Sequence, residues 1–116
     1  MYRIGEFAIL TGVSVKTLRY YDYINLLKPS KIDQYTNYRY YTNEELTKFQ
    51  KIEYLKKLGF TLEEIKANLA NLTPHCIEQK KEELKAKRDL IMTQIAELEL
   101  LKESLIQNKS KVLSKR

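Results

Sequence analysis

The chain lacks several features that would place it in a protein class at once. Its 116 residues contain a single cysteine, Cys76, so no internal disulfide can stabilise the fold. No run approaches the roughly 18 apolar residues that a membrane helix needs. The amino terminus, MYRIGEFAI, has neither the apolar core nor the cleavage site of a signal peptide. We therefore expect a cytoplasmic protein, without a membrane partner, that is stabilised by packing.

Residues for catalysis or metal binding are also scarce. The chain has one histidine and no glycine-rich phosphate loop, and its carboxylates stand at predicted helix starts or alternate with lysines. Cys76 follows His75, but a thiolate metal site needs two to four ligands and no second cysteine is present. We expect no enzymatic activity, no catalytic residue, no cofactor and no metal. Cys76 is then a partly buried small residue, with a metal-sensing role as the alternative.

Positive charge is in surplus. Lys and Arg number 21 against 15 Asp and Glu, which gives a formal net charge of +6 and favours a polyanionic partner such as nucleic acid. Charged residues make up 31% and hydrophobic residues 43% of the chain, a balance typical of a folded protein. The length suits one domain with an accessory element.

The amino-terminal segment predicts two helices joined by a short turn. Ile4, Phe7 and Ala8 recur at helical spacing. Gly12 follows them and suits the left-handed residue that ends a helix, and Ser14 fits the N-cap of a second helix. Two helices joined by a glycine-containing turn form a helix-turn-helix candidate.

A hairpin and two further helices follow. The second helix must end before Pro29, and Asn25 suits its left-handed terminator. The next stretch, KPSKIDQYTNYRYYT, has no helical period and predicts two short strands joined through residues 33–37. Capping boxes, in which a Thr and the Glu three residues later bind each other's backbone N–H groups, then start two helices: Thr42 with Glu45, and Thr61 with Glu64.

The last part of the chain predicts one long helix. Thr73 fits its N-cap and Pro74 its first position, and no proline or glycine interrupts the chain afterwards. To Asn108 the helix would run about 52 Å at about 1.5 Å per residue. An apolar residue recurs every seven positions, as in one column of a coiled coil: Ile77, Leu84, Ile91, Leu98 and Leu105. In the companion column only Ile95 is apolar. Since a single such helix would expose much apolar surface, we expect a homodimer.

One short stretch, TLRYYDYI at residues 17–24, loads three tyrosines and an arginine onto the second predicted helix. At 100° per residue, Val15 and Leu18 face the first helix. The outward face then carries two cations and two phenols: Lys16, Arg19, Tyr20 and Tyr23. Lys and Arg neutralise phosphates, and a tyrosine hydroxyl can donate to a phosphate oxygen. The residue types on this face predict that it contacts a DNA groove.

Tyrosine and positive charge continue together into the predicted hairpin. Seven of the nine tyrosines lie between residues 20 and 41, and residues 14–41 hold five cations against two aspartates. We expect Tyr21, Tyr40 and Tyr41 to fill the core with their hydroxyls at its rim. DNA contact is the favoured interpretation for three others: Arg19, Tyr20 and Arg39.

Three stretches, in order, carry a specific resemblance: YRIGEFAILTGVSVKTLRYYDYINLLKP, NYRYYT and LKKLGFTLEEIKANL. With them the sequence resembles the MerR family of transcriptional regulators, most closely its multidrug-responsive branch. The resemblance implies an all-α dominated fold, with a winged helix-turn-helix domain at residues 1–72 and a small β-hairpin as the wing. A coiled-coil dimerisation helix at residues 73–108 and a frayed basic tail at 109–116 would follow.

The resemblance also implies a function. Such proteins bind an inverted-repeat promoter as homodimers that are joined through an antiparallel coiled coil. They bend and untwist the over-long spacer between the two promoter elements, so that RNA polymerase can engage both elements. Carried over by position, the DNA-contacting residues are Ser14, Lys16, Thr17, Arg19, Tyr20, Lys28, Tyr38 and Arg39. The expected dimerisation residues are Ile77, Leu84, Ile91, Ile95, Leu98 and Leu105.

Some alternatives stay open from the sequence. Members of the family usually continue into an effector-binding or metal-binding segment, whereas the sequence ends at Arg116; it belongs either to a naturally short member or to part of a longer protein. An architectural DNA-bending protein, or a repressor that lacks an effector response, would use the same fold and contacts. A coiled-coil adaptor with an incidental basic domain is a third possibility.

Overall fold

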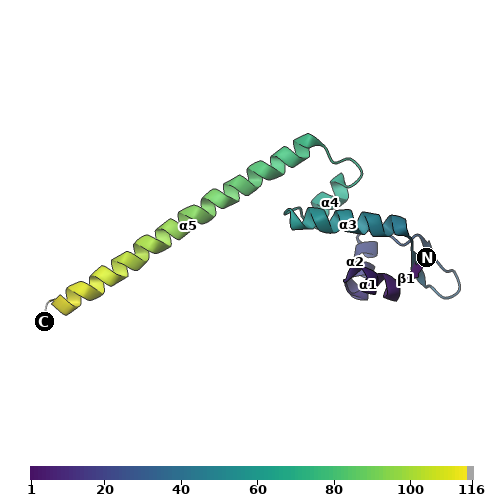
Figure 1. Ribbon diagram of the computed structural model, residues 1–116, viewed down its shortest axis with the longest axis horizontal. Helices are drawn as coiled ribbons and strands as arrows, with labels where there is room; N and C mark the ends of the chain where they lie inside the picture. The colour runs from purple at the N-terminus through teal and green to yellow at the C-terminus, as the bar shows by residue number, and fades with distance from the viewer. Residues whose placement is uncertain (115–116) are drawn as a thin grey trace. The chain divides into compact units, whose positions relative to one another are not determined.

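The computed structural model describes the backbone of residues 1–114 and the side chains of residues 1–109. The chain divides into two compact units, Met1–Thr73 and Pro74–Arg116. The first unit contains three short strands and four helices (Figure 1): β1 (Tyr2–Arg3), α1 (Ile4–Thr11), α2 (Val15–Tyr23), β2 (Lys31–Ile32), β3 (Arg39–Tyr41), α3 (Asn43–Lys57) and α4 (Leu62–Asn68). The second unit is the helix α5 (Pro74–Ser114). The predicted fold class, a helical protein with a small wing and a long carboxyl-terminal helix, is confirmed.

The predicted helix-turn-helix is formed by α1 and α2. Gly12 ends α1 in the left-handed conformation, at a φ of 79°, and its N–H donates to the Ala8 carbonyl. Ser14 caps α2, because its Oγ accepts from the Thr17 N–H at 3.0 Å. Asn25, at a φ of 61°, follows the end of α2. Each of these turn residues has the role that the sequence predicts for it.

The sheet is antiparallel, with the strand order β1, β3, β2. The predicted hairpin is confirmed, since Lys31 pairs with Tyr40 and Ile32 with Arg39. Its turn is closed by the Asp33 side chain, whose Oδ1 accepts from the backbone of Tyr35 and Thr36. The third strand, β1, was not expected from the sequence. It places the amino terminus beside the wing.

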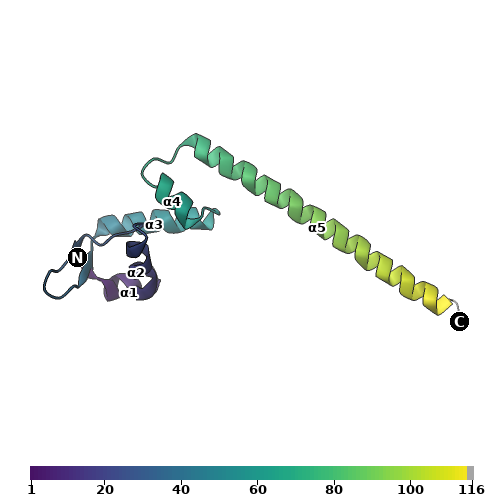
Figure 2. The ribbon, with the colours of Figure 1, turned by 180° about the vertical axis from the view of Figure 1, so that it is seen from behind.

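The core of the first unit gathers side chains from both halves of that unit. In Figures 1 and 2, α1 and α2 lie on one side of α3 and α4 lies on the other. Eight side chains are almost fully buried: Phe7, Leu18, Tyr21, Leu26, Leu27, Tyr41, Ile52 and Ile65. The rings of Phe7 and Tyr41 stack at 4.4 Å, and Phe49 meets Phe7 edge-on at 6.4 Å. Tyr21 and Tyr41 fill the core as predicted, but the Tyr41 hydroxyl is buried rather than at the rim. Val15 and Tyr40 are only half-buried.

Local capping fixes α3 and α4 where the sequence places them. Both predicted capping boxes are present. In the first box Glu45 accepts from the Thr42 N–H at 2.7 Å, and in the second Glu64 accepts from the Thr61 N–H at 2.9 Å. Between the two helices Gly59 adopts a φ of 96°, a left-handed conformation that other residues avoid. These contacts set the position of α4 beside α3.

The long helix α5 contains 41 residues and begins at Pro74, as predicted. It continues past Asn108, where we expected it to end, to Ser114; the last two residues of the expected frayed tail lie outside the described residues. At about 1.5 Å per residue its length is about 61 Å. Within residues 1–114, no helix is both long enough and apolar enough to cross a membrane.

Candidate nucleic-acid interface

The helix α2 has the two faces that its sequence predicts. Leu18 and Tyr21 are buried against the core, whereas Lys16 and Arg19 are exposed. Tyr20 keeps 50% of its surface exposed, so its ring can meet a partner while its other edge packs on the protein. Burial of Leu18 forces this orientation, because residues one position away emerge about 100° around the helix. The result is an exposed cationic and phenolic face.

Two predicted contact residues at the start of α2 also have a structural role. The Ser14 Oγ lies 3.0 Å from the Thr17 Oγ1 and accepts from the Thr17 backbone. These hydroxyls therefore fix the first turn of the helix. The position of this first turn sets the direction in which the exposed side chains of α2 point.

One carboxylate joins α2 to the wing. Asp22 is 8% exposed, and its Oδ2 accepts from the Arg39 Nε at 3.0 Å. Its Oδ1 accepts from the Lys28 Nζ, also at 3.0 Å, and the same ammonium reaches the Asp22 carbonyl at 3.3 Å. Burial alone would raise the pKa of Asp22, but the hydrogen bonds from Lys28 and Arg39 outweigh it and hold this pKa below its ordinary value. The aspartate is therefore ionised at neutral pH.

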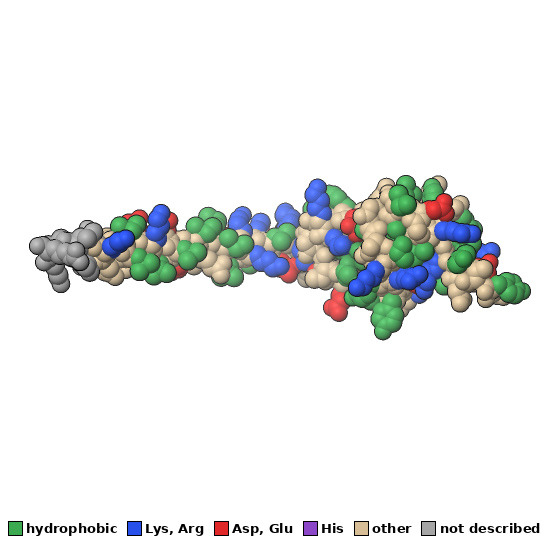
Figure 3. Space-filling model, turned by 90° about the horizontal axis from the view of Figure 1, so that it is seen from below, with side chains coloured by type: hydrophobic (Ala, Val, Ile, Leu, Met, Phe, Trp, Pro, Cys, Tyr) green, Lys and Arg blue, Asp and Glu red, His purple; other side chains and the backbone are tan. Residues whose placement is uncertain are grey.

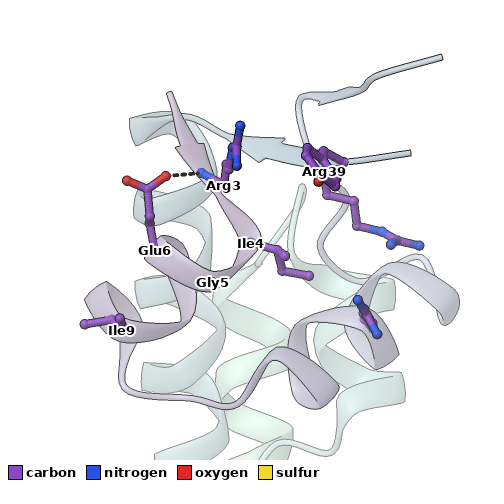
Figure 4. A pocket seen from close by; sticks show the side chains of 8 residues that line it. Arg3, Ile4, Gly5, Glu6, Ile9 and Arg39 are labelled. Carbon is purple, nitrogen blue, oxygen red and sulfur yellow. Dashed lines mark hydrogen bonds between the residues drawn. The ribbon is translucent and has the colours of Figure 1, made fainter. Parts of the chain in front are cut away.

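An open concavity of about 750 Å³ lies where β1, α1, α2 and β3 meet. It is lined by Arg3, Ile4, Gly5, Glu6, Ile9, Arg19, Tyr38 and Arg39. Figure 4 shows Arg3 and Arg39 on neighbouring strands above the α1 backbone, with Glu6 bonded to the Arg3 N–H. The Arg3 guanidinium lies 4.9 Å from the centroid of the Tyr38 ring, a cation–π contact. Three guanidinium groups from three elements thus share one surface.

The structure brings together three residues predicted from the sequence, Arg19, Tyr38 and Arg39, and adds two that were not predicted. Arg3 is missed because its position depends on β1, a two-residue strand that is too short to show a period. In the sequence Asp22 is one of two aspartates in the cationic segment, and as the one carboxylate of α2 it could have signalled a partner for cations. Figure 3 shows Lys and Arg side chains among hydrophobic ones on a face of the first unit.

The predicted dimerisation residues lie on the second unit and are solvent-exposed in the single chain. Their exposed fractions are 37% for Ile77, 42% for Leu84, 53% for Ile91, 60% for Ile95, 64% for Leu98 and 61% for Leu105. Hydrophobic side chains follow the helix in Figure 3. Cys76 is half-buried. Among the described residues, no three His, Cys, Asp or Glu side chains form a group that could hold a metal ion.

The fold and this surface define a winged helix-turn-helix protein with a cationic face. Residues 2–72 match the MerR HTH family of regulatory proteins, and residues 46–107 match the MerR DNA-binding family. The chain therefore belongs to the MerR family, a family of transcriptional regulators rather than enzymes. The predicted resemblance to this family and to its multidrug-responsive branch is confirmed.

Similar proteins extend the comparison. The multidrug-efflux transporter 1 regulator of Bacillus subtilis is 51% identical over 65 residues, which cover 56% of this chain and 23% of that protein. The solved amino-terminal part of the Bacillus subtilis multidrug transporter activator, MtaN, is 33% identical with a TM-score of 0.78, covering 85% of this chain and 95% of that chain. HiNmlR, a MerR family regulator lacking the sensor domain and bound to promoter DNA, is 28% identical with a TM-score of 0.54. The match covers 94% of this chain and 87% of that chain. The chain spans about a third or less of the curated relatives that it matches first.

Proposed function

We propose that two copies of this chain bind an inverted-repeat promoter element and distort its DNA to control transcription by RNA polymerase. The observation that carries the proposal is the concavity that Arg3, Arg19 and Arg39 line together. Guanidinium groups bind phosphate oxygens in two-pronged geometry, and backbone contacts of this kind position a protein on the duplex. The exposed face of α2 then enters the major groove, which is about 12 Å wide and admits a helix.

The proposed contacts divide into two sets. On α2, Lys16, Arg19 and Tyr20 face the groove and its phosphates. In the wing, Tyr38 and Arg39 grip the backbone, and Arg3 joins them because it lies over the Tyr38 ring. The remaining proposed residues support these sets at the start of α2 and behind the wing: Ser14, Thr17 and Lys28.

The exposed apolar stripe of α5 supports pairing with a second copy. Five apolar residues, each at least 53% exposed, follow one another at steps of four, three, three and four: Ile91, Ile95, Leu98, Leu101 and Leu105. This spacing reads the same in both directions from Leu98. When two identical helices run antiparallel with a two-fold axis at Leu98, each apolar residue therefore meets another across the interface.

The segment before this stripe carries ion pairs within the helix. Lys81 pairs with Glu78 at 3.4 Å and Lys85 with Glu82 at 3.2 Å, at the three-residue spacing that brings helix side chains together. Such a surface remains well solvated in a single helix. The main dimer contact is therefore proposed for the stripe centred on Leu98, with Ile77 and Leu84 contributing less.

A dimer of this kind presents two copies of α2 to one duplex. Half-sites would be separated by about one DNA turn, roughly 34 Å, and specificity would depend on the energy of deforming the spacer as well as on base contacts. The solved relative bound to promoter DNA supports promoter DNA as the partner of this chain.

Selection of bound duplexes from a random pool tests the proposal. We expect an inverted repeat with a constant spacing between half-site centres, bound by a protein that sediments as a dimer. A monomer that selects no repeat would refute it. Transcription in vitro from the selected site then separates two mechanisms: stimulation on an over-long spacer supports control by distortion, whereas blocking alone supports the architectural or repressor alternative.

A further inference from the structure

The Asp22 ion pairs connect three parts of the DNA-binding unit. Asp22 belongs to α2, Lys28 to the loop after it, and Arg39 to β3 of the wing, and both cations reach the carboxylate at 3.0 Å. Asp22 is almost buried, whereas the side chains of Arg39 and Lys28 are 31% and 60% exposed. The carboxylate therefore lies inside the protein, whereas the guanidinium and the ammonium that it binds are partly exposed to solvent.

Arg39 is held by one edge only. Its Nε donates to Asp22, and a guanidinium has four further N–H donors on its terminal nitrogens. Arg39 also lines the concavity together with Arg3 and Arg19. The carboxylate therefore fixes the plane of the guanidinium and leaves its outer edge for a phosphate.

We propose that Asp22 is a positioning residue that holds Arg39 and Lys28 in one arrangement relative to α2, and so makes binding selective for operator DNA. This inference rests on the proposed function. Without the carboxylate, the Lys28 and Arg39 side chains repel each other and can each bind whichever phosphate group is nearest. Non-operator DNA then gains contacts that operator DNA already has, and selectivity falls.

The substitution Asp22→Asn removes the charge and keeps the size of the side chain. Because both cations are partly exposed, water replaces the lost partner and the fold should persist, which thermal unfolding checks. Each freed side chain must be immobilised again on binding, so we expect the ratio of operator affinity to scrambled-duplex affinity to fall about tenfold. Affinity for the scrambled duplex should rise.

Glu63→Gln is the matched control. Glu63 is exposed and lines a separate hollow with Tyr20 and Tyr23, so this variant removes the same charge near α2 without touching Lys28 or Arg39. We expect it to raise both affinities by a similar factor and to leave their ratio unchanged. If Asp22→Asn does the same, Asp22 acts only through its charge and the inference is wrong.

Amide hydrogen exchange tests, without DNA, whether the Asp22 ion pairs hold the wing in place; we call these ion pairs the clamp. The wing is closed by backbone bonds from Ser30 to Tyr40 at 2.8 Å and from Asp33 to Tyr38 at 2.9 Å. In Asp22→Asn we expect the Ser30 and Asp33 amides to exchange about tenfold faster at unchanged global stability, and in Glu63→Gln to stay as in the wild type. Unchanged exchange would overturn the clamp. A wild type that fails to distinguish operator from scrambled duplex would instead count against the proposed function.

Discussion

Two buried tyrosines in the DNA-binding unit should respond in opposite ways to loss of their hydroxyl group. Tyr41 is 0% exposed, and within the described residues its hydroxyl has no hydrogen-bond partner. Tyr21 is 2% exposed, but its hydroxyl donates to Glu53 at 3.2 Å and accepts from Lys56 at 3.1 Å. The substitution to Phe is the same at both sites, so the sign of the effect depends on the hydrogen bonds.

For Tyr41→Phe we expect a gain in stability. A buried polar group without a partner costs about 1–3 kcal/mol, and the substitution removes that cost. The void left by the oxygen, about 10 Å³, costs only about 0.2 kcal/mol at roughly 24 cal/mol per Å³. The net gain should be about 1 kcal/mol, which raises Tm by about 4–8 °C in a domain of this size. Tyr21→Phe should instead lose about 1 kcal/mol, because two hydrogen bonds disappear.

The pH dependence gives a second measure of the same hydroxyl. Burial, with a smaller contribution from the charge of Asp22, raises the pKa of Tyr41 to about 12, from the ordinary value of 10.0. Above about pH 10 the unfolded chain loses this proton while the folded chain keeps it, so the stability of the wild type falls as the pH rises. By about pH 11 the loss amounts to about 1.4 kcal/mol, and Tyr41→Phe should not show it.

Chemical denaturation of the three proteins at equal concentration, from neutral pH to about pH 11, measures both effects. Equal concentration matters because the proposed dimerisation would contribute to the apparent stability. The difference between Tyr41→Phe and the wild type should grow with pH. A Tyr41→Phe variant less stable than the wild type by more than about 0.5 kcal/mol would show that the hydroxyl is hydrogen-bonded. A difference that stays constant with pH would show that the hydroxyl is hydrated and its pKa not raised.

Four further predictions concern the proposed function and its metal-sensing alternative. Leu98→Lys should weaken dimerisation by at least about 3 kcal/mol, because two ammonium groups would meet at the two-fold axis. The neighbouring substitution Glu97→Lys should not weaken it. Sedimentation measures dimerisation of the two variants, and a binding assay measures their affinity for DNA. Arg39→Ala should weaken binding to all sequences alike and lower the slope of log affinity against log salt by about 0.9, and an unchanged slope would remove the wing from the interface. The same slope change is expected for Arg3→Ala. Cys76→Ser should leave DNA affinity unchanged with or without a chelator, and metal-dependent affinity in the wild type would revive the sensor alternative.

The elements of this fold that the sequence predicts are those specified by neighbouring residues. Gly12 and Asn25 adopt the left-handed conformations that their types favour, and the capping boxes at Thr42 and Thr61 form as expected. Each of these signals acts over a few residues. Burial of Leu18 follows from helical spacing in the same way, and it fixes the face that α2 exposes.

The features that could not be predicted depend on contacts between distant residues. β1 exists because Tyr2 pairs with Tyr41 and Arg3 with Tyr40, and a two-residue strand has no pattern of its own. Pairing with β3 is what carries Arg3 to the concavity. The partners of Asp22 could not be predicted for the same reason, since Arg39 reaches it only after the hairpin has folded back toward α2.

The short strand β3 joins stability to DNA recognition in this unit. Side chains of residues two apart on a strand leave the same face, so Arg39 and Tyr41 share one. Tyr41 stacks on Phe7 in α1, and Arg39 binds Asp22 in α2, so both helices of the helix-turn-helix hold the same strand. The abundance of tyrosine therefore has two causes: Tyr41 fills the core with a large ring, whereas Tyr38, 49% exposed, supports the Arg3 cation at the surface. In the proposed complex, a wing held at both points would meet DNA in one position, which selective binding by so small a unit requires.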